Sequence, residues 1–307
     1  MHESLGMFLN CGVDLFIFIS GYLYGIRGIC EYKKWYARRA LTVSLPAIVV
    51  SIVFMIVLQI FNHTVSLNQL ILYLFDLEGL LMTSWKIVNP IVSGIPGLGP
   101  LWFTTVIMLC YLLVPLLQRI SVRIKNYYVV ISLVFSIGII LSFITDGYFS
   151  LVYFTIFIIG YLCGQIRILE KVNNVVFIAS SVLFLISALG RLYLHRIMDD
   201  TIIYSSYVTV QTIIAGLYVV VFISYAFNKY PKVIIRIANK KTTRLLEKYS
   251  FFVYLTHGVF CMGYFNVYEK TSLLIATCLF VFGTIISSVL IRLVTNLCSK
   301  PFLKLLK

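Results

Sequence analysis

Long apolar segments separated by short polar ones dominate the pattern along the chain. A helix of about 20 apolar residues crosses the hydrocarbon core of a bilayer. No segment alternates polar and apolar positions as the strands of a membrane barrel do, so we expect helices. The pattern predicts an all-α integral membrane protein, a polytopic helical bundle with about nine transmembrane helices in a single domain, residues 1–307. The predicted spans are 7–29, 40–61, 101–118, 127–145, 148–166, 173–192, 206–227, 249–266 and 272–296.

One stretch between the second and third spans departs from this pattern. VSLNQLILYLFDLEGLLMTSW is apolar but is interrupted by Asn68, Asp76 and Glu78. We expect it to lie on the membrane or to re-enter it rather than to cross.

Composition agrees with a membrane protein. Hydrophobic residues make up 61% of the chain and charged residues 12%, against about a quarter charged in typical soluble proteins. The seven cysteines lie in or beside apolar runs without C-x-x-C spacing, so we interpret them as packing residues rather than as zinc ligands or disulfides.

The basic residues predict the orientation. If the loop from Arg27 to Arg39 marks one side, the alternating spans place 21 Lys and Arg residues on that side and 4 on the other. By the positive-inside rule the first side is cytoplasmic, and so is the C-terminus. We therefore expect a multi-pass protein of the cell membrane. The net charge of +14 does not predict a nucleic-acid partner, because no soluble basic module gathers it.

Residue 1 then lies outside the cytoplasm, with nothing basic before the first span to fix that orientation. An additional helix upstream would explain it, with His2 and Glu3 at its outer end.

Several motifs resemble the membrane acyltransferase 3 family. GVDLFIFISGYLYG followed by YKKWYARRALTVSLP resembles the start of that family. GPLWF (99–103), IIGYLCGQ (158–165) and YSFFVYLTHGVF (249–260) resemble its later motifs, in the right order. The family has ten spans, so the resemblance implies that this chain lacks the first helix and retains His2 as its last conserved residue.

The resemblance implies a membrane-bound O-acyltransferase. Such enzymes move an acyl group, usually acetyl, from cytoplasmic acyl-CoA to a hydroxyl of a cell-surface polysaccharide or lipid-linked glycan. We expect acetyl-CoA as donor substrate, no bound cofactor, and the lipid bilayer and a glycan acceptor as partners; the oligomeric state stays open. The alternative is a transporter or flippase of polysaccharide precursors, but the sequence shows neither inverted repeats nor paired broken helices.

Three residues are candidates for catalysis. Neutral imidazole at His2 can accept a hydroxyl proton, although the residues alone also fit a polar chain end. Asp14 lies in an apolar helix on one face with Gly21 and Gly25, a G-x-x-x-G packing motif, so it faces the bundle interior. A site role and a structural hydrogen bond both remain open for Asp14.

His257 is the third candidate. Counted from Tyr249, it lies about 12 Å along its helix, near the middle of the bilayer. It shares a polar face with Ser250, Tyr254, Cys261 and Tyr264. This face either forms a helix-to-helix hydrogen bond or lines the transfer pathway.

Lys34, Arg38 and Arg39 are candidates for binding the donor. They form a cytoplasmic basic cluster that either anchors the helix to headgroups or clamps the CoA phosphates. Arg39 falls on the first arginine of the family's R-x-x-R motif and Thr42 on the second. Arg38 points about 100° away from Arg39.

Two further segments carry polar residues. HRIMDD (195–200) has one histidine and two carboxylates, which is too common a combination to predict a metal site. The segment 62–100, with Asp76, Glu78, Trp85 and SGIPGLGP, could present an acceptor sugar, but interfacial aromatic and turn residues are also expected without a ligand.

Overall fold

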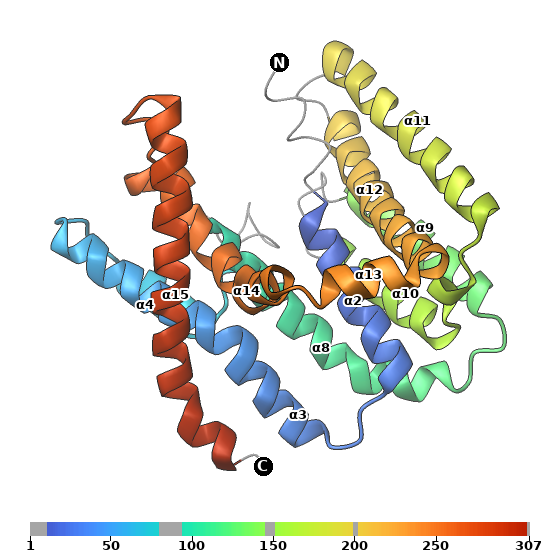
Figure 1. Ribbon diagram of the computed structural model, residues 1–307, viewed down its shortest axis with the longest axis horizontal. Coiled ribbons are helices and arrows are strands. Elements are labelled where there is room, and N and C mark those ends of the chain that lie inside the picture. Colours follow the sequence, from blue (N-terminus) through green and yellow to red (C-terminus); the bar gives the residue numbers. More distant parts are fainter. Residues whose placement is uncertain (1–10, 80–93, 145–150, 199–201, 306–307) are drawn as a thin grey trace. The chain divides into compact units, whose positions relative to one another are not determined.

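The computed structural model describes residues 11–79, 94–144, 151–198 and 202–305 (Figure 1). Every regular element in these ranges is a helix. The α-helices are α2 (Gly12–Arg27), α3 (Tyr32–Arg39), α4 (Leu45–Ile60), α5 (Leu67–Leu74), α8 (Trp102–Ser121), α9 (Tyr127–Ile144), α10 (Leu151–Gln165), α11 (Asn174–Met198), α12 (Ile202–Lys229), α13 (Pro231–Ala238), α14 (Lys241–Cys261) and α15 (Leu273–Leu305).

The chain divides into two compact units. Unit 1 comprises Met1–Cys30 and Leu112–Ile237, and unit 2 comprises Glu31–Tyr111 and Ala238–Lys307. The single domain expected from the sequence stays a prediction.

The all-helical prediction is confirmed for the described residues. A helix lies in each of the nine predicted spans, and five helical segments there are long and apolar enough to cross a membrane. These five are Tyr32–Ile60, Gly99–Ser121, Asn174–Met198, Ser206–Lys229 and Leu273–Lys304. The α5 helix has only 8 residues, which agrees with a segment that does not cross. The count of nine crossings stays a prediction.

The predicted span 249–266 differs from the observed helix at both ends. Its helix, α14, begins eight residues earlier at Lys241, because Lys, Arg, Leu and Glu are good helix formers that a search for apolar residues overlooks. It ends at Cys261, where Met262 is extended and Gly263 adopts a φ of +73° that favours glycine.

In unit 1, α2 packs against α10 through paired glycines. A Cβ atom on Gly21 would approach the carbonyl oxygen of Phe157 to 2.2 Å, and one on Gly160 would approach that of Phe18 to 2.3 Å. Gly25 and Gly164 repeat this one turn further on. The two backbones are therefore in direct contact, which confirms the packing motif predicted on the first helix and reveals a matching one in IIGYLCGQ.

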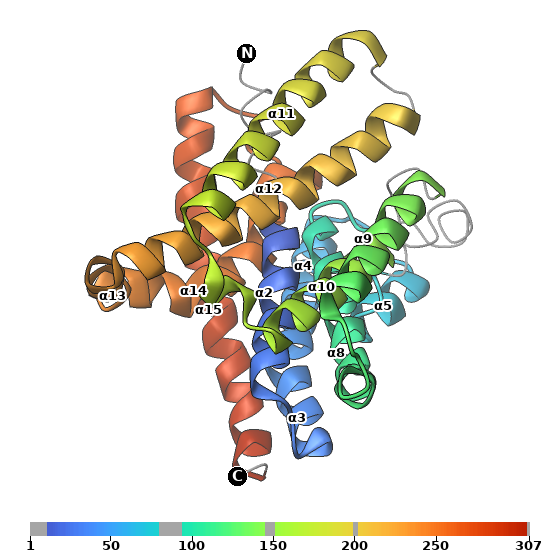
Figure 2. The same ribbon diagram turned by 90° about the vertical axis from the view of Figure 1, so that its right-hand side faces the viewer.

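The α11 and α12 helices lie side by side in unit 1, as Figure 2 shows. The buried Arg191 on α11 donates a hydrogen bond of 2.6 Å from Nη1 to Oε1 of Gln211 on α12. This bond gives the buried guanidinium a polar acceptor, as a charge inside a helical bundle requires.

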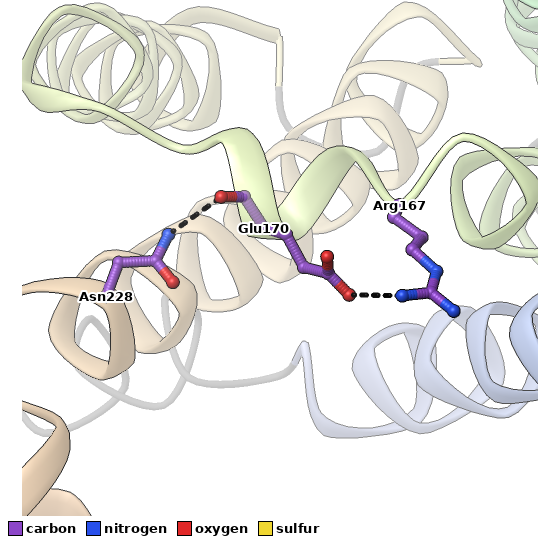
Figure 3. A network of polar contacts seen from close by, with 3 residues as sticks. All are labelled: Arg167, Glu170 and Asn228. Atoms are coloured by element: carbon purple, nitrogen blue, oxygen red, sulfur yellow. Dashed lines mark hydrogen bonds and ion pairs between the residues drawn. The ribbon is translucent and has the colours of Figure 1, made fainter.

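The connection from α10 to α11 is fixed by Asn228 on α12 (Figure 3). The Asn228 amide donates to the carbonyl oxygens of Leu169 and Val172, each at 3.3 Å. Within the loop, Arg167 and Glu170 form an exposed ion pair of 3.6 Å. The Asn228 amide thereby provides a hydrogen-bond donor to backbone carbonyl groups that lie outside the α-helices.

In unit 2, α4, α14 and α15 pack around a common core. Phe54 and Leu58 of α4 are buried there with Leu255 of α14 and Ile291 of α15. The segment 94–101 packs into the same core, with Leu98 and its neighbours Ile95 and Leu101 buried.

Candidate active site

Arg39 is held against an aromatic cluster in unit 2. Its guanidinium lies 5.6 Å from the centre of the Tyr111 ring, within cation–π range. The Trp35 ring meets Tyr111 edge to face at 5.6 Å, and the Tyr36 hydroxyl donates to the Tyr111 carbonyl oxygen at 3.3 Å. The aromatic residues therefore restrict the direction in which the half-buried Arg39 side chain can point.

The other two predicted donor-binding residues lie on the surface of α3. Arg38 is exposed, and Lys34 is exposed and paired with Glu31 at 3.0 Å. An exposed ion pair of this kind contributes little to stability. The helix thus carries one half-buried cation, Arg39, and two exposed ones.

A π-helical turn follows Arg39 directly. Ala40–Ser44 form this turn, which joins α3 to α4 in one continuous helix. Such turns are rare and often mark functional sites. The Thr42 hydroxyl donates to the carbonyl oxygen of Arg38 at 2.9 Å and also approaches that of Arg39 at 3.3 Å. Thr42, which stands at the second arginine position of the family's R-x-x-R motif, therefore hydrogen-bonds to the backbone of its own helix and supplies no cation.

A buried acidic pair that the sequence did not place in the site lies beside α8. Asp76 and Glu78 are 6% and 4% exposed, and Thr104 of α8 is fully buried. The Thr104 hydroxyl oxygen lies 2.5 Å from Oδ1 of Asp76 and 3.5 Å from Oε1 of Glu78. That the segment 62–100 presents an acceptor sugar stays a prediction, and Trp85 of that segment lies outside the described residues. The feature of the sequence that could have identified this pair is the presence of two carboxylates inside an apolar stretch.

Hydrogen-bond counting indicates that this pair retains a proton. The single hydrogen of the Thr104 hydroxyl cannot serve both Asp76 and the Leu101 carbonyl oxygen at 2.7 Å. A proton retained by the pair supplies the missing donor. Burial raises the pKa of Asp76, and burial together with the charge of Asp76 raises the pKa of Glu78.

The acidic pair lies near two other features of unit 2, the π turn and the contact between Arg39 and Tyr111. The Ser44 side chain, at the end of the π turn, lies near enough to the Asp76 carboxyl group to oppose the effect of burial on its pKa. Thr104 and Tyr111 lie seven residues apart on one face of α8, about 10 Å along its axis. The Asp76–Glu78 pair and the Arg39–Tyr111 contact therefore lie on the same side of α8, about two turns apart.

His257 is half-buried on α14 with a defined tautomer. Its Nδ1 lies 2.5 Å from the carbonyl oxygen of Tyr254, which can only accept. Nδ1 therefore carries the proton, and Nε2 of the neutral ring keeps its lone pair. The ring can act as a base or as a hydrogen-bond acceptor through Nε2.

The face of α14 around His257 packs on the GPLWF motif. The Tyr254 hydroxyl donates to the Pro100 carbonyl oxygen at 2.9 Å, and its ring meets Phe103 at 5.4 Å. A Cβ atom on Gly258 would approach Pro100 Cδ to 2.6 Å, so only glycine allows this close approach. Two motifs far apart in the sequence thus form one packed contact beside His257.

The polar stripe predicted on this helix is shorter than expected. Because α14 ends at Cys261, Tyr264 falls in a separate turn, where its ring packs on His63 at 3.9 Å. Ser250 is exposed and bonds to the Glu247 carbonyl oxygen. His257 lies four residues from the end of α14, or about 6 Å along its axis. The predicted depth in the bilayer is not tested.

The remaining two predicted catalytic residues are Asp14 and His2. Asp14 belongs to unit 1, where it is buried on α2 beside Gly216 of α12, as the face shared with Gly21 predicted. His2 lies outside the described residues. The described residues contain no group of three or more His, Cys, Asp or Glu that could hold a metal ion.

The helices indicate the class of protein, and the match to a family model then identifies the family. Five helices of membrane-spanning length and composition, within the described ranges, indicate a membrane protein. The chain matches the family model for an acyltransferase domain over residues 2–292, nearly its whole length. It therefore belongs to this acyltransferase family, and the resemblance inferred from its motifs is confirmed. No curated protein and no solved structure matched the chain.

Proposed function

We propose that this membrane acyltransferase moves an acyl group, usually acetyl, from acyl-CoA to a hydroxyl of a cell-surface polysaccharide or lipid-linked glycan. The observation that carries the proposal is the positioned guanidinium of Arg39 above Tyr111, directly before a π turn. Acyl-CoA carries phosphates, and an arginine fork binds phosphate through paired N–H donors.

Arg39 is the proposed principal contact for the CoA phosphates. Its side chain is already oriented by the Tyr111 ring, so less conformational freedom is lost when a phosphate binds. Arg38 and Lys34 are exposed on α3 and add positive charge in the neighbourhood of Arg39. They are proposed to attract the donor rather than to orient it.

The transfer itself requires a base. The base takes the proton of the acceptor hydroxyl while the hydroxyl oxygen attacks the thioester carbonyl. The C–S bond then breaks, and the CoA thiolate leaves and is protonated. His2 is the proposed base near the acceptor, and His257 is proposed to act nearer the thioester through Nε2. Asp14 is proposed to orient a histidine or pair an arginine.

The proposed setting is the cell membrane, with the C-terminus in the cytoplasm. The basic loops support this orientation, because the cytoplasmic side carries 21 of the 25 Lys and Arg residues. Acyl-CoA then reaches α3 from the cytoplasm.

Mass spectrometry of surface glycans tests the proposal. Cells that express the protein should carry ester-linked acyl groups that mild alkali removes, and a deletion strain should lose them. The alternative function is a precursor flippase. It would be supported if the deletion left acyl content unchanged while glycan precursor accumulated in the inner leaflet.

A further inference from the structure

Unit 2 contains an apolar cavity that the proposed transfer reaction does not use. Its volume is about 450 Å³, within the range typical of ligand sites. The walls come from α4, α14 and α15 and from the connection between the last two. Nearly all side chains in the wall are aliphatic or aromatic, and the Thr256 hydroxyl is bonded to the Phe252 carbonyl oxygen of its own helix.

The cavity extends along α4, and its wall includes one cation. Val50 and Val57 both line it, so it follows the helix for about 10 Å. Lys270 is the one charged residue among the described residues of the wall. It lies in the connection between the end of α14 and the start of α15.

The ammonium group of Lys270 is oriented by one hydrogen bond and has further N–H donors. Nζ donates one hydrogen bond of 2.6 Å to the carbonyl oxygen of Tyr264. An ammonium group has three N–H donors, so two remain for a ligand. The neighbouring carboxylate of Glu269 is exposed and accepts a hydrogen bond of 2.7 Å from Asn266. Glu269 weakens the positive potential here but is engaged by another side chain.

We propose that this cavity binds one hydrocarbon chain of an anionic phospholipid from the surrounding bilayer, with its phosphate at Lys270. A mostly apolar cavity with a single cation in its wall is complementary to a lipid tail that ends in a phosphate. The apolar wall suits the hydrocarbon chain as the bilayer interior does, so the preference for this site comes from the charge-assisted hydrogen bond to the phosphate. The thioester and the glycan hydroxyl are not involved.

Native mass spectrometry of the purified full chain tests the proposal, with phosphatidylglycerol and phosphatidylcholine as competing probes. The wild type should retain phosphatidylglycerol preferentially, and Lys270→Gln should lower that preference roughly fivefold, the effect expected for one lysine near a lipid surface. Lys300→Gln, an exposed lysine of α15, should leave it unchanged.

A second pair of variants tests the cavity itself. Val57→Trp should fill it and lower retention of phosphatidylglycerol. Ile56→Trp serves as the matched control, because Ile56 is the next residue of α4, is exposed and does not line the cavity. Circular dichroism verifies that each variant is folded.

Three results would overturn the proposal. They are equal retention of both lipids by the wild type, no change in Lys270→Gln, and loss of lipid in both tryptophan variants. An isoprenyl phosphate that displaces phosphatidylglycerol completely would show that the occupant is not a bilayer phospholipid. Because the readout is binding, its outcome is separate from that of the transfer assay.

Discussion

At the scale of single residues, neighbours in the sequence occupy different environments. Arg38 and Arg39 are adjacent, yet Arg38 is exposed, whereas Arg39 is half-buried with its guanidinium over the Tyr111 ring. The helical period predicted that they point apart. It could not identify Tyr111 as the partner of Arg39, because that contact depends on how α8 packs. The burial of Asp76 was equally hidden, since polar residues in an interrupted segment look solvated until Thr104 is placed beside them.

Substitutions at His257 can distinguish a residue that acts as a base from one that makes only a structural hydrogen bond. His257→Asn retains a side-chain donor near the Tyr254 carbonyl oxygen but has no counterpart of Nε2. If Nε2 relays a proton, both His257→Ala and His257→Asn should lower the turnover number, by less than the ~10²–10⁴-fold expected for His2→Ala. Turnover in reconstituted vesicles is the measurement. Wild-type turnover in His257→Asn would show that the ring is structural, and wild-type turnover in His2→Ala would exclude His2 as the base.

The acidic pair predicts a pH-dependent stability. Asp76 has a pKa raised by burial to about 6 in the folded chain, above its ordinary value of 3.8. Between these values the folded state binds more protons than the unfolded state, so stability is present at low pH and is lost as pH rises through about 6. From pH 5 to pH 8 the loss should be about 1 kcal/mol.

Thermal unfolding in detergent at pH 5 and pH 8 measures this effect. Asp76→Asn should reduce the difference between the two midpoints, since it has no proton to lose. Glu269→Gln is the control at an exposed carboxylate. A pH dependence that is identical in Asp76→Asn and the wild type would contradict the account of the pair.

At the scale of helices, the apolar segments predicted where helices occur but not where they begin and end. The polar residues before Tyr249 belong to α14 because they favour helix, and a hydropathy pattern does not register that preference. The π turn at Ala40–Ser44 was also invisible, because no residue type specifies it. The G-x-x-x-G motif was predictable, since two small residues four positions apart permit backbone contact.

The glycine contact between α2 and α10 gives a direct test of packing. Gly21→Ala should destabilise the protein by roughly 1–3 kcal/mol, because the new methyl group would overlap the Phe157 carbonyl oxygen and the helices would have to separate. Gly12→Ala is the control, as a Cβ atom there meets nothing within 4 Å. The midpoint of thermal unfolding is the measurement. Equal midpoints for the two variants would show that the helices do not pack this closely.

At the scale of the whole molecule, the charge distribution predicts the topology. Single cysteines introduced at Lys270 and Lys240, in a chain without its native cysteines, should react with a membrane-impermeant maleimide from opposite sides. Position 270 should be labelled in intact cells, and position 240 only after the membrane is opened. Reversed labelling would discard the orientation and the cytoplasmic approach of acyl-CoA to α3.

The most direct test of the central claim is transfer of labelled acetyl from acetyl-CoA to glycan in inside-out membrane vesicles. The account predicts label in a glycan ester that mild alkali releases. Arg39→Ala should raise the KM for acetyl-CoA about tenfold or more, as expected for loss of a charge-assisted hydrogen bond, while Arg38→Ala should raise it much less. No label in the glycan with the wild type, or equal effects of the two substitutions, would contradict the account.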